Sequence, residues 1–202
     1  MSEITGPAEK PERLFIGVPL TPDARQGLQK VLPRHLPGKL VPPANWHFTL
    51  RFLGPTLPPV RDDVIARLRA ATCGKEFTIR FAELGAFPLP RRARIVWVGV
   101  DEGADRLSQL AAIAEASARG AGFEAETKEF RPHLTLARIE PPASVKTLLS
   151  TNTKIGLRMP VTALVLYRSR LGGGPARYEE VERFELSRNQ ESGPGAGDGS
   201  HL

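Results

Sequence analysis

The sequence predicts a mixed α and β protein that carries the same strand motif once in each half. Segments that alternate apolar and polar residues, as strands do, take turns with segments that keep the spacing of amphipathic helices. The tetrapeptide His-x-Thr-Leu occurs at residues 47–50 and again at 133–136, each time inside an alternating run. These observations favour an internal duplication, although the sequence shows no further repeat outside residues 47–54 and 133–140.

Length and composition limit the domain organisation. A chain of 202 residues can form one substantial domain or two small lobes packed together. With 41% hydrophobic and 25% charged residues, it has the composition of a soluble globular protein. We expect a single domain over residues 13–186, made of two lobes. Residues 1–12 and the Gly- and Ser-rich residues 187–202, which include His201, are expected to be disordered.

The lack of a recognisable targeting signal and the cysteine usage favour a cytoplasmic location. No run approaches the roughly 18 apolar residues that span a membrane. The polar residues 1–12 lack the apolar core of a signal peptide. The single cysteine, Cys73, excludes an internal disulfide and fits a reducing compartment. We interpret Cys73 as a buried or half-buried residue near a helix end. Nothing in the sequence demands a partner protein, so we expect a monomer.

The strands and helices are expected in alternating order. The predicted strands cover residues 13–18, 46–53, 77–81, 94–100, 130–139, 161–167 and 178–186, with a short segment near 39–41. The predicted helices run from the Thr21-Pro22 start signal to about residue 32, from Pro58 to a stop at Gly74, and over residues 104–118 and 142–149. His35 lies in a proline-rich break and is expected to be a solvated loop residue.

The motif strands present chemically useful groups on one face. Successive side chains in a strand point to opposite faces, so His47 and Thr49 share one face, and His133 and Thr135 share one face in the second copy. An imidazole with a pKa near 6.5 donates or accepts protons around neutral pH. Two such groups on opposite sides of a phosphodiester supply a general base and a general acid, each typically worth about 10²–10⁴-fold in rate. The threonine hydroxyls can then donate to the charged phosphate oxygens.

A basic side chain would complete such a site, and the chain is rich in arginine. The net charge is +6, and 21 of the 28 basic residues are Arg, whose planar fork suits phosphate. Arg51 and Arg138 are the local candidates. Strict alternation places Arg51 on the face of His47 but places Arg138 opposite His133, unless that strand twists or ends.

Other uses of two histidines find little support in the sequence. A zinc site needs further Cys, His or carboxylate ligands, and no close Cys/His or His-x-x-x-His spacing exists. There is no Gly-x-Ser-x-Gly elbow, no P-loop and no Gly-x-Gly-x-x-Gly turn. A non-catalytic RNA-binding module, which would use a basic cleft only to hold phosphate, stays open as an alternative.

The chain resembles the two-histidine (2H) phosphoesterases, which are defined by paired His-x-Thr/Ser motifs. It is most similar to their RNA 2',3'-cyclic phosphodiesterase branch, also called 2'-5' RNA ligase. The resemblance extends from residue 13 to about 186. It rests on Arg13-Leu-Phe-Ile, on residues 47–54, on Trp97-Val-Gly-Val, on Phe130-Arg-Pro-His-Leu-Thr-Leu-Ala-Arg138 and on residues 166–171.

This resemblance implies an α+β fold with two pseudo-symmetric lobes, each an antiparallel sheet with helices on its outer face, around a central cleft. It implies that RNA ending in a 2',3'-cyclic phosphate is hydrolysed to a 2'-phosphate without metal or cofactor, with 2'-5' RNA ligation as the reverse reaction. The alternatives within the family are enzymes for 2'-5' oligonucleotides or nucleotide cyclic phosphates. The implied roles are general acid for His47, general base for His133 and substrate binding for Thr49, Thr135, Arg138 and Phe15, the last by stacking on the terminal base.

Overall fold

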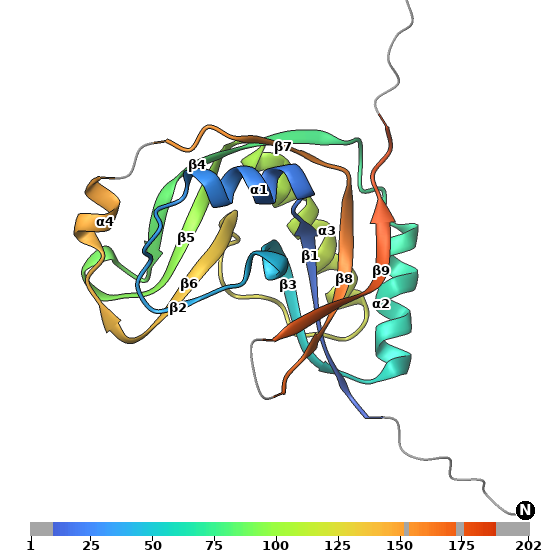
Figure 1. Ribbon diagram of the computed structural model, residues 1–202. Coiled ribbons are helices and arrows are strands. Elements are labelled where there is room, and N and C mark those ends of the chain that lie inside the picture. Colours follow the sequence, from blue (N-terminus) through green and yellow to red (C-terminus); the bar gives the residue numbers. More distant parts are fainter. Residues whose placement is uncertain (1–9, 152–153, 173–175, 189–202) are drawn as a thin grey trace, which may run out of the picture.

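The computed structural model describes residues 10–151, 154–172 and 176–188, and organises them around one curved antiparallel sheet (Figure 1). The nine strands of this described part run in the order β7-β4-β5-β6-β3-β1-β8-β9, with β2 paired to β6 beside this path. Figure 1 shows the sheet as an arch that passes from β4 and β5 through β6 and β3 to β8 and β9. The ends of the chain, including His201, lie outside the described residues.

The elements alternate along the chain as expected. The strands are β1 (Glu12–Pro19), β2 (Lys39–Leu40), β3 (His47–Thr56), β4 (Phe77–Phe87), β5 (Ala93–Glu102), β6 (His133–Ala143), β7 (Arg158–Val161), β8 (Ala163–Arg170) and β9 (Arg177–Glu185). The helices are α1 (Pro22–Val31), α2 (Pro58–Ala70), α3 (Ala104–Gly120) and α4 (Lys146–Ser150), with 3₁₀ turns η1 (Pro43–Asn45) and η2 (Pro90–Arg92). None of the described helices is long and apolar enough to cross a membrane.

The sheet consists of two four-stranded halves that meet at the motif strands. One half is β7-β4-β5-β6 and the other is β3-β1-β8-β9. They are joined through β3 and β6, where Phe48 and Leu134 form the single pair in register. The expected α+β fold with two related antiparallel halves is therefore confirmed, and the two halves form one continuous sheet.

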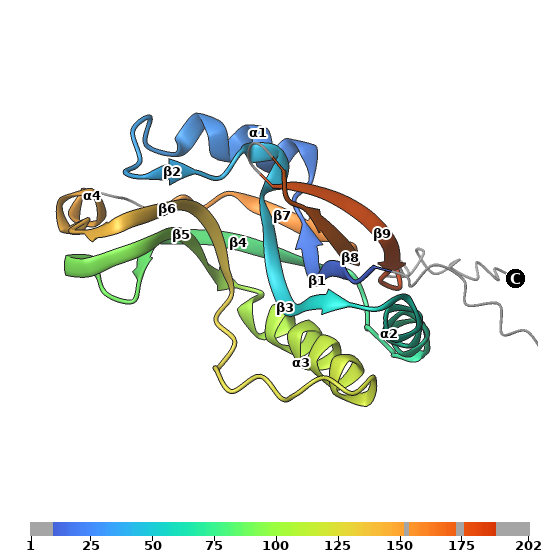
Figure 2. The ribbon, with the colours of Figure 1, turned by 90° about the horizontal axis from the view of Figure 1, so that it is seen from below.

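The apolar faces of the motif strands anchor the core. Phe48 and Leu134 are fully buried, and the ring of Phe48 stacks on Phe81 with centroids 5.8 Å apart. Burial of such side chains contributes roughly 1.5–3 kcal/mol each. Helix α3 packs against β3, and α2 packs against α3 (Figure 2). Because this core holds one face of β3 and β6, the opposite face of both strands is free to carry the site.

Several of the expected boundaries are wrong, among them the end of β4, expected at residue 81, and the start of β6, expected at residue 130. Helix α2 ends at Ala70 and not at Gly74, because Ala71 is already extended. Gly74, with φ +79°, instead turns the chain so that its carbonyl accepts a hydrogen bond from Ser187. The predicted helix over residues 142–149 shrinks to α4, because β6 continues to Ala143, and β7 was not predicted.

Candidate active site

The four motif side chains lie in one cavity of about 220 Å³ at the seam between the two halves of the sheet. His47 and Thr49 lie on either side of Phe48, and His133 and Thr135 lie on either side of its partner Leu134. Because the strands run antiparallel, each histidine faces the threonine of the other motif. The arrangement has an approximate two-fold axis through the central pair.

Both imidazoles are oriented by backbone carbonyls two residues upstream. The Nδ1–H of His47 donates to the Asn45 carbonyl at 2.7 Å, and that of His133 donates to the Arg131 carbonyl at 2.6 Å. A carbonyl can only accept, so each contact places the proton on Nδ1 in the neutral ring. The Nε2 atoms are therefore the ones that exchange protons in the cavity.

The two half-sites differ in their internal hydrogen bonds. In the first motif, the Thr49 hydroxyl donates to His47 Nε2 at 2.9 Å. In the second motif, the Thr135 hydroxyl has no hydrogen-bond partner among the described residues. In the first half-site the histidine and the threonine are hydrogen-bonded to each other, whereas in the second neither His133 Nε2 nor the Thr135 hydroxyl is engaged by a described residue.

Burial and positive charge lower the pKa of both histidines. Burial is the main cause of the shift to about 4 for the pKa of His47, with further contributions from the charges of Arg138 and His133. The pKa of His133 is also lowered, first by burial and then by Arg138, and the carbonyl of Arg131 acts in the opposite direction. Both imidazoles are therefore neutral at pH 7 in the empty site.

The lowered pKa of His47 predicts a pH-dependent stability. The unfolded chain protonates this imidazole near pH 6.5, but the folded chain does so only near pH 4. Between these values the unfolded state binds more protons, so the free energy of unfolding decreases as the pH falls. We expect His47 to account for a loss of roughly 3 kcal/mol between pH 7 and pH 4. Urea unfolding of the wild type and of His47→Gln, which cannot titrate, measures it, and equal pH slopes would contradict it.

A one-residue bulge in β6 brings Arg138 to the site. Val96 of β5 pairs with Ala137, and Trp97 pairs with Thr135, so Leu136 is the extra residue. Leu136 and Ala137 are consequently both buried, and Arg138 returns to the face of His133 and lines the cavity. Strict alternation was wrong here because it assumes an unbroken ladder.

The first motif strand contains the corresponding bulge, with the opposite effect on Arg51. The register between β1 and β3 skips Leu50, so Arg51 turns to the buried face. There its Nε lies 2.6 Å from a carboxylate oxygen of Glu115 on α3, and its side chain is only 11% exposed. The prediction that Arg51 faces the site is therefore wrong. Phe52, 59% exposed, lines the cavity instead.

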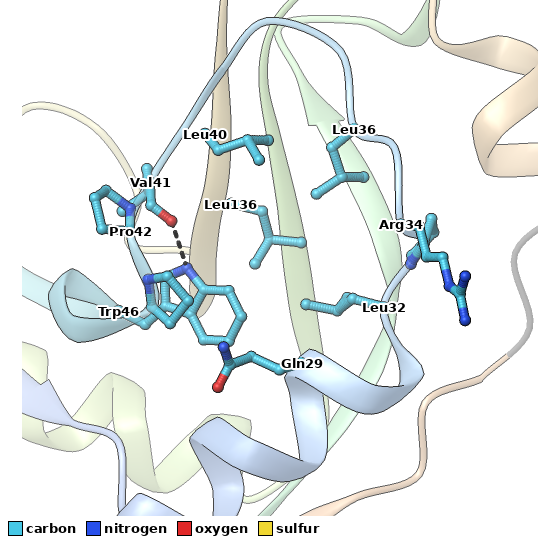
Figure 3. Close-up of a pocket in the computed structure, with 11 residues that line it drawn as sticks. Gln29, Leu32, Arg34, Leu36, Leu40, Val41, Pro42, Trp46 and Leu136 are labelled. Carbon is cyan, nitrogen blue, oxygen red and sulfur yellow. Dashed lines mark hydrogen bonds between the residues drawn. The ribbon is translucent and has the colours of Figure 1, made fainter.

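The bulge residue Leu136 turns into a separate, largely apolar cavity of about 460 Å³ (Figure 3). Figure 3 shows Leu136 and Trp46 beside the leucines that follow α1, with the indole Nε1 of Trp46 donating to the Val41 carbonyl at 3.0 Å. This cavity contains neither histidine. It shows where the extra side chain is accommodated when the bulge redirects Arg138.

Aromatic rings pack against both histidines. The ring of Phe15 packs on His47 with centroids 4.7 Å apart, and Tyr178 meets the same imidazole edge-on at 5.2 Å. Phe87 meets His133 edge-on at 5.0 Å. Phe15 is only 3% exposed, and it lines the cavity that adjoins the catalytic one. The expected stacking role of Phe15 stays a prediction, and Phe52 is the more exposed aromatic residue beside it.

A second repeat, which the sequence analysis missed, lies on the strands beside the motifs. Residues 15–18 read Phe-Ile-Gly-Val on β1, and residues 97–100 read Trp-Val-Gly-Val on β5. A Cβ on Gly17 would lie 2.8 Å from the Phe48 carbonyl oxygen and 3.3 Å from His47 Cδ2. One on Gly99 would lie 3.1 Å from the Trp97 ring. The signal in the sequence was an aromatic residue two positions before a glycine.

Gly17→Ala tests this close approach. The added methyl group must displace the β3 backbone or the His47 ring, because overpacking of a fitted contact costs about 1–3 kcal/mol. We expect that loss in urea unfolding, together with a shifted imidazole resonance of His47 in NMR spectra. Gly172→Ala is the matched control, since its Cβ would meet nothing within 4 Å. Equal stability of the two variants would contradict the prediction.

Metal and thiol chemistry find no assembled site in the described chain. There, no three His, Cys, Asp or Glu side chains gather as potential metal ligands. Cys73 is half-buried, as expected, and burial raises the pKa of its thiol, which disfavours the nucleophilic thiolate. Metal independence itself stays a prediction, which a chelator tests.

Comparison with known proteins points to one family. Residues 19–173 match the model of the 2'-5' RNA ligase superfamily. A protein of Aeropyrum pernix named RNA 2',3'-cyclic phosphodiesterase is 40% identical over 121 residues, which cover 60% of this chain and 68% of the relative. A protein of the same name from Thermus thermophilus is 33% identical over 199 residues, covering 91% of this chain and 96% of the relative.

Solved structures show the same fold. The crystal structure of E. coli LigT complexed with 3'-AMP matches with a TM-score of 0.76 at 26% identity, over 87% of this chain and 98% of the other. The paired His-x-Thr motifs in one cavity, together with these matches, identify the protein as a 2H phosphoesterase. Within that class, the chain belongs to the 2'-5' RNA ligase superfamily.

Proposed function

We propose that the protein hydrolyses RNA 2',3'-cyclic phosphate termini to 2'-phosphates without a metal ion. The observation that carries the proposal is the shared cavity in which two imidazoles, two hydroxyls and the Arg138 guanidinium converge. These groups supply proton transfer and anion binding for a phosphodiester. The relatives named RNA 2',3'-cyclic phosphodiesterase support this choice of substrate.

In the proposed reaction the two half-sites act on opposite sides of phosphorus. His133 Nε2 accepts a proton from water, and the water oxygen bonds to phosphorus. The bond from phosphorus to the ribose 3'-oxygen breaks, and that oxygen takes the proton from His47 Nε2. The products are a 2'-phosphate and a free 3'-hydroxyl, and proton exchange with solvent restores both histidines. With the 5'-hydroxyl of a second RNA in place of water, the same step joins that oxygen to phosphorus and frees the 3'-hydroxyl, which is 2'-5' RNA ligation.

Substrate binding must protonate His47 for this role. Burial keeps the ring neutral in the empty site, whereas the negative charge of a bound phosphate favours the imidazolium. Protonation also changes the contact with Thr49, because Nε2 then donates and no longer accepts. The Thr49 hydroxyl proton becomes available to a phosphate oxygen. Thr135, which has no partner among the described residues, is available to the phosphate from the start.

Phe52 and Arg138 are proposed to hold the terminal base. Each lies five residues after its histidine, and each lines the cavity. A base can stack on an exposed aromatic ring and on the plane of a guanidinium. In the described chain Arg138 has no carboxylate partner that would compete with such a ligand.

A comparison of substrates tests the proposal. Equal amounts of an RNA ending in a 2',3'-cyclic phosphate, a 2'-5'-linked dinucleotide and a mononucleoside 2',3'-cyclic phosphate are incubated with the protein, and the products are identified by mass spectrometry. We expect the RNA to react fastest. Faster cleavage of the 2'-5' linkage would assign the site to another 2H activity, and binding without turnover would indicate an RNA-binding module.

We further propose that the protein acts as a cytoplasmic monomer.

A further inference from the structure

A second cavity, of about 360 Å³, adjoins the catalytic one. The two cavities share Phe52, Arg138 and Tyr178 as lining residues. The second cavity continues toward the start of β1 and the end of β8, and contains neither histidine. A ligand whose reacting phosphate lies between the histidines can therefore extend into the second cavity and remain in contact with the protein.

Arg13 is the basic residue that this second cavity adds to Arg138. In the described part of the chain, its guanidinium has no hydrogen bond or ion pair. The arginines of neighbouring β8 are different, since Arg168 pairs with Glu12 and Arg170 pairs with Glu179. Arg13 is therefore free to bind an anion from outside the chain, whereas Arg168 and Arg170 are engaged.

The position of Arg13 separates it from the reacting phosphate. Gly17 pairs with Thr49, and Arg13 lies four residues earlier on the same strand. At about 3.3 Å per residue, the backbone of Arg13 is about 13 Å from that of Gly17. A phosphate held between the histidines is too distant for its guanidinium. An anion that contacts Arg13 is therefore a different group from the reacting phosphate, and a further phosphate of the same ligand fits this position.

Two exposed apolar side chains accompany Arg13 in the second cavity. Phe52 is 59% exposed and Leu171 is 71% exposed, and both line the second cavity. Large exposed apolar groups beside a free guanidinium are suited to a base and its phosphate, because bases stack on such surfaces and phosphate pairs with the cation.

We propose that the second cavity binds the nucleotide on the 5' side of the terminal one, and that Arg13 contacts the phosphate joining the two. This inference rests on the proposed function. It makes the preferred substrate an oligonucleotide with a cyclic end, and it makes Arg13 a specificity-determining residue that does not touch the reacting atoms.

The test compares two substrates in two variants. The substrates are a dinucleotide ending in a 2',3'-cyclic phosphate and the corresponding mononucleoside cyclic phosphate. In Arg13→Gln, we expect the ratio of their kcat/KM values to fall about tenfold from its wild-type value, as one lost charge-assisted contact predicts. Arg170→Gln is the matched control, because Arg170 already pairs with Glu179, and it should keep the wild-type ratio. An unchanged ratio in Arg13→Gln would overturn the proposal.

A neutral linkage shows whether the charge is what Arg13 recognises. With a methylphosphonate between the two nucleotides, the wild type and Arg13→Gln should have the same ratio, and a persisting difference would overturn the proposal. Affinities for an unreactive dinucleotide 2'-phosphate and mononucleoside 2'-phosphate give the same comparison without turnover. If the wild type hydrolyses neither cyclic substrate, the proposed function fails, and these affinities still decide the role of Arg13.

Discussion

Replacing His47 or His133 by Ala is expected to lower kcat for cyclic-phosphate hydrolysis by about 10³-fold in each case, within the range for loss of one positioned acid or base. Both imidazoles present Nε2 to the same cavity, and each is held by its own backbone carbonyl. Because they act in one step, the double variant should lose much less than the product of the two effects. Initial rates on a cyclic-phosphate RNA measure all three variants.

The leaving group separates the two roles. A p-nitrophenyl phosphodiester releases a stable phenolate that needs little protonation. On this substrate, loss of the general acid should matter far less than loss of the general base. We therefore expect His47→Ala to recover most of its activity and His133→Ala to stay impaired. Recovery of His133→Ala instead would exchange the two assignments, and near wild-type activity of either variant on the cyclic phosphate would refute the mechanism.

Because of the bulges, replacing the two arginines that follow the motifs should have opposite effects, one on activity and the other on stability. Arg138→Ala should lower kcat/KM by about 10²-fold, because a charged hydrogen bond is worth about 1.5–3 kcal/mol, and should leave the free energy of unfolding unchanged. Arg51→Ala should lower the free energy of unfolding by about 3 kcal/mol, since it leaves Glu115 without its partner in a partly buried position. Urea unfolding and kcat/KM, measured on both variants, provide the comparison.

Glu115→Gln supplies the control for this pair. It removes the charge that faces Arg51 without touching the cavity, so it should reproduce part of the instability of Arg51→Ala and none of the catalytic defect of Arg138→Ala. A catalytic loss in Arg51→Ala at temperatures where it is folded, or full activity in Arg138→Ala, would contradict the assignment of faces.

The motif residues and the general fold could be predicted from the sequence. The alternation of His47, Thr49, His133 and Thr135 with buried residues is local, and it already determines which side chains share a face. The duplication of the motif then predicted two related halves. The shared face of each His-x-Thr pair depends only on strand geometry over three residues, whereas the arrangement of the two halves around a cleft was implied by the resemblance to the 2H phosphoesterases.

The arginines could not be placed in the same way. A bulge changes the face of every later residue, and it is determined by pairing with another strand. Local sequence offered only a weak sign in β6, where Leu136 and Ala137 are consecutive apolar residues. In β3 the local sequence offered no such sign, because the partner that accommodates Arg51 on the buried face, Glu115, lies on a distant helix.

The contacts that support His47 could not be predicted for a related reason. Phe15 was expected only to stack on a base, and Gly17 looks like an ordinary residue of a buried strand. Both contact His47, which is 30 or more residues away. Arg13 likewise gains its proposed role from the cavity that forms when β1, β3 and β8 assemble.

The central claim is a metal-free hydrolysis shared between two half-sites, and the position of the product phosphate tests it most directly. An RNA ending in a 2',3'-cyclic phosphate is incubated with the protein in excess EDTA, and the product is examined by ³¹P NMR. The account predicts undiminished turnover and a 2'-phosphate beside a free 3'-hydroxyl. A 3'-phosphate, or activity that EDTA abolishes and zinc restores, would contradict it.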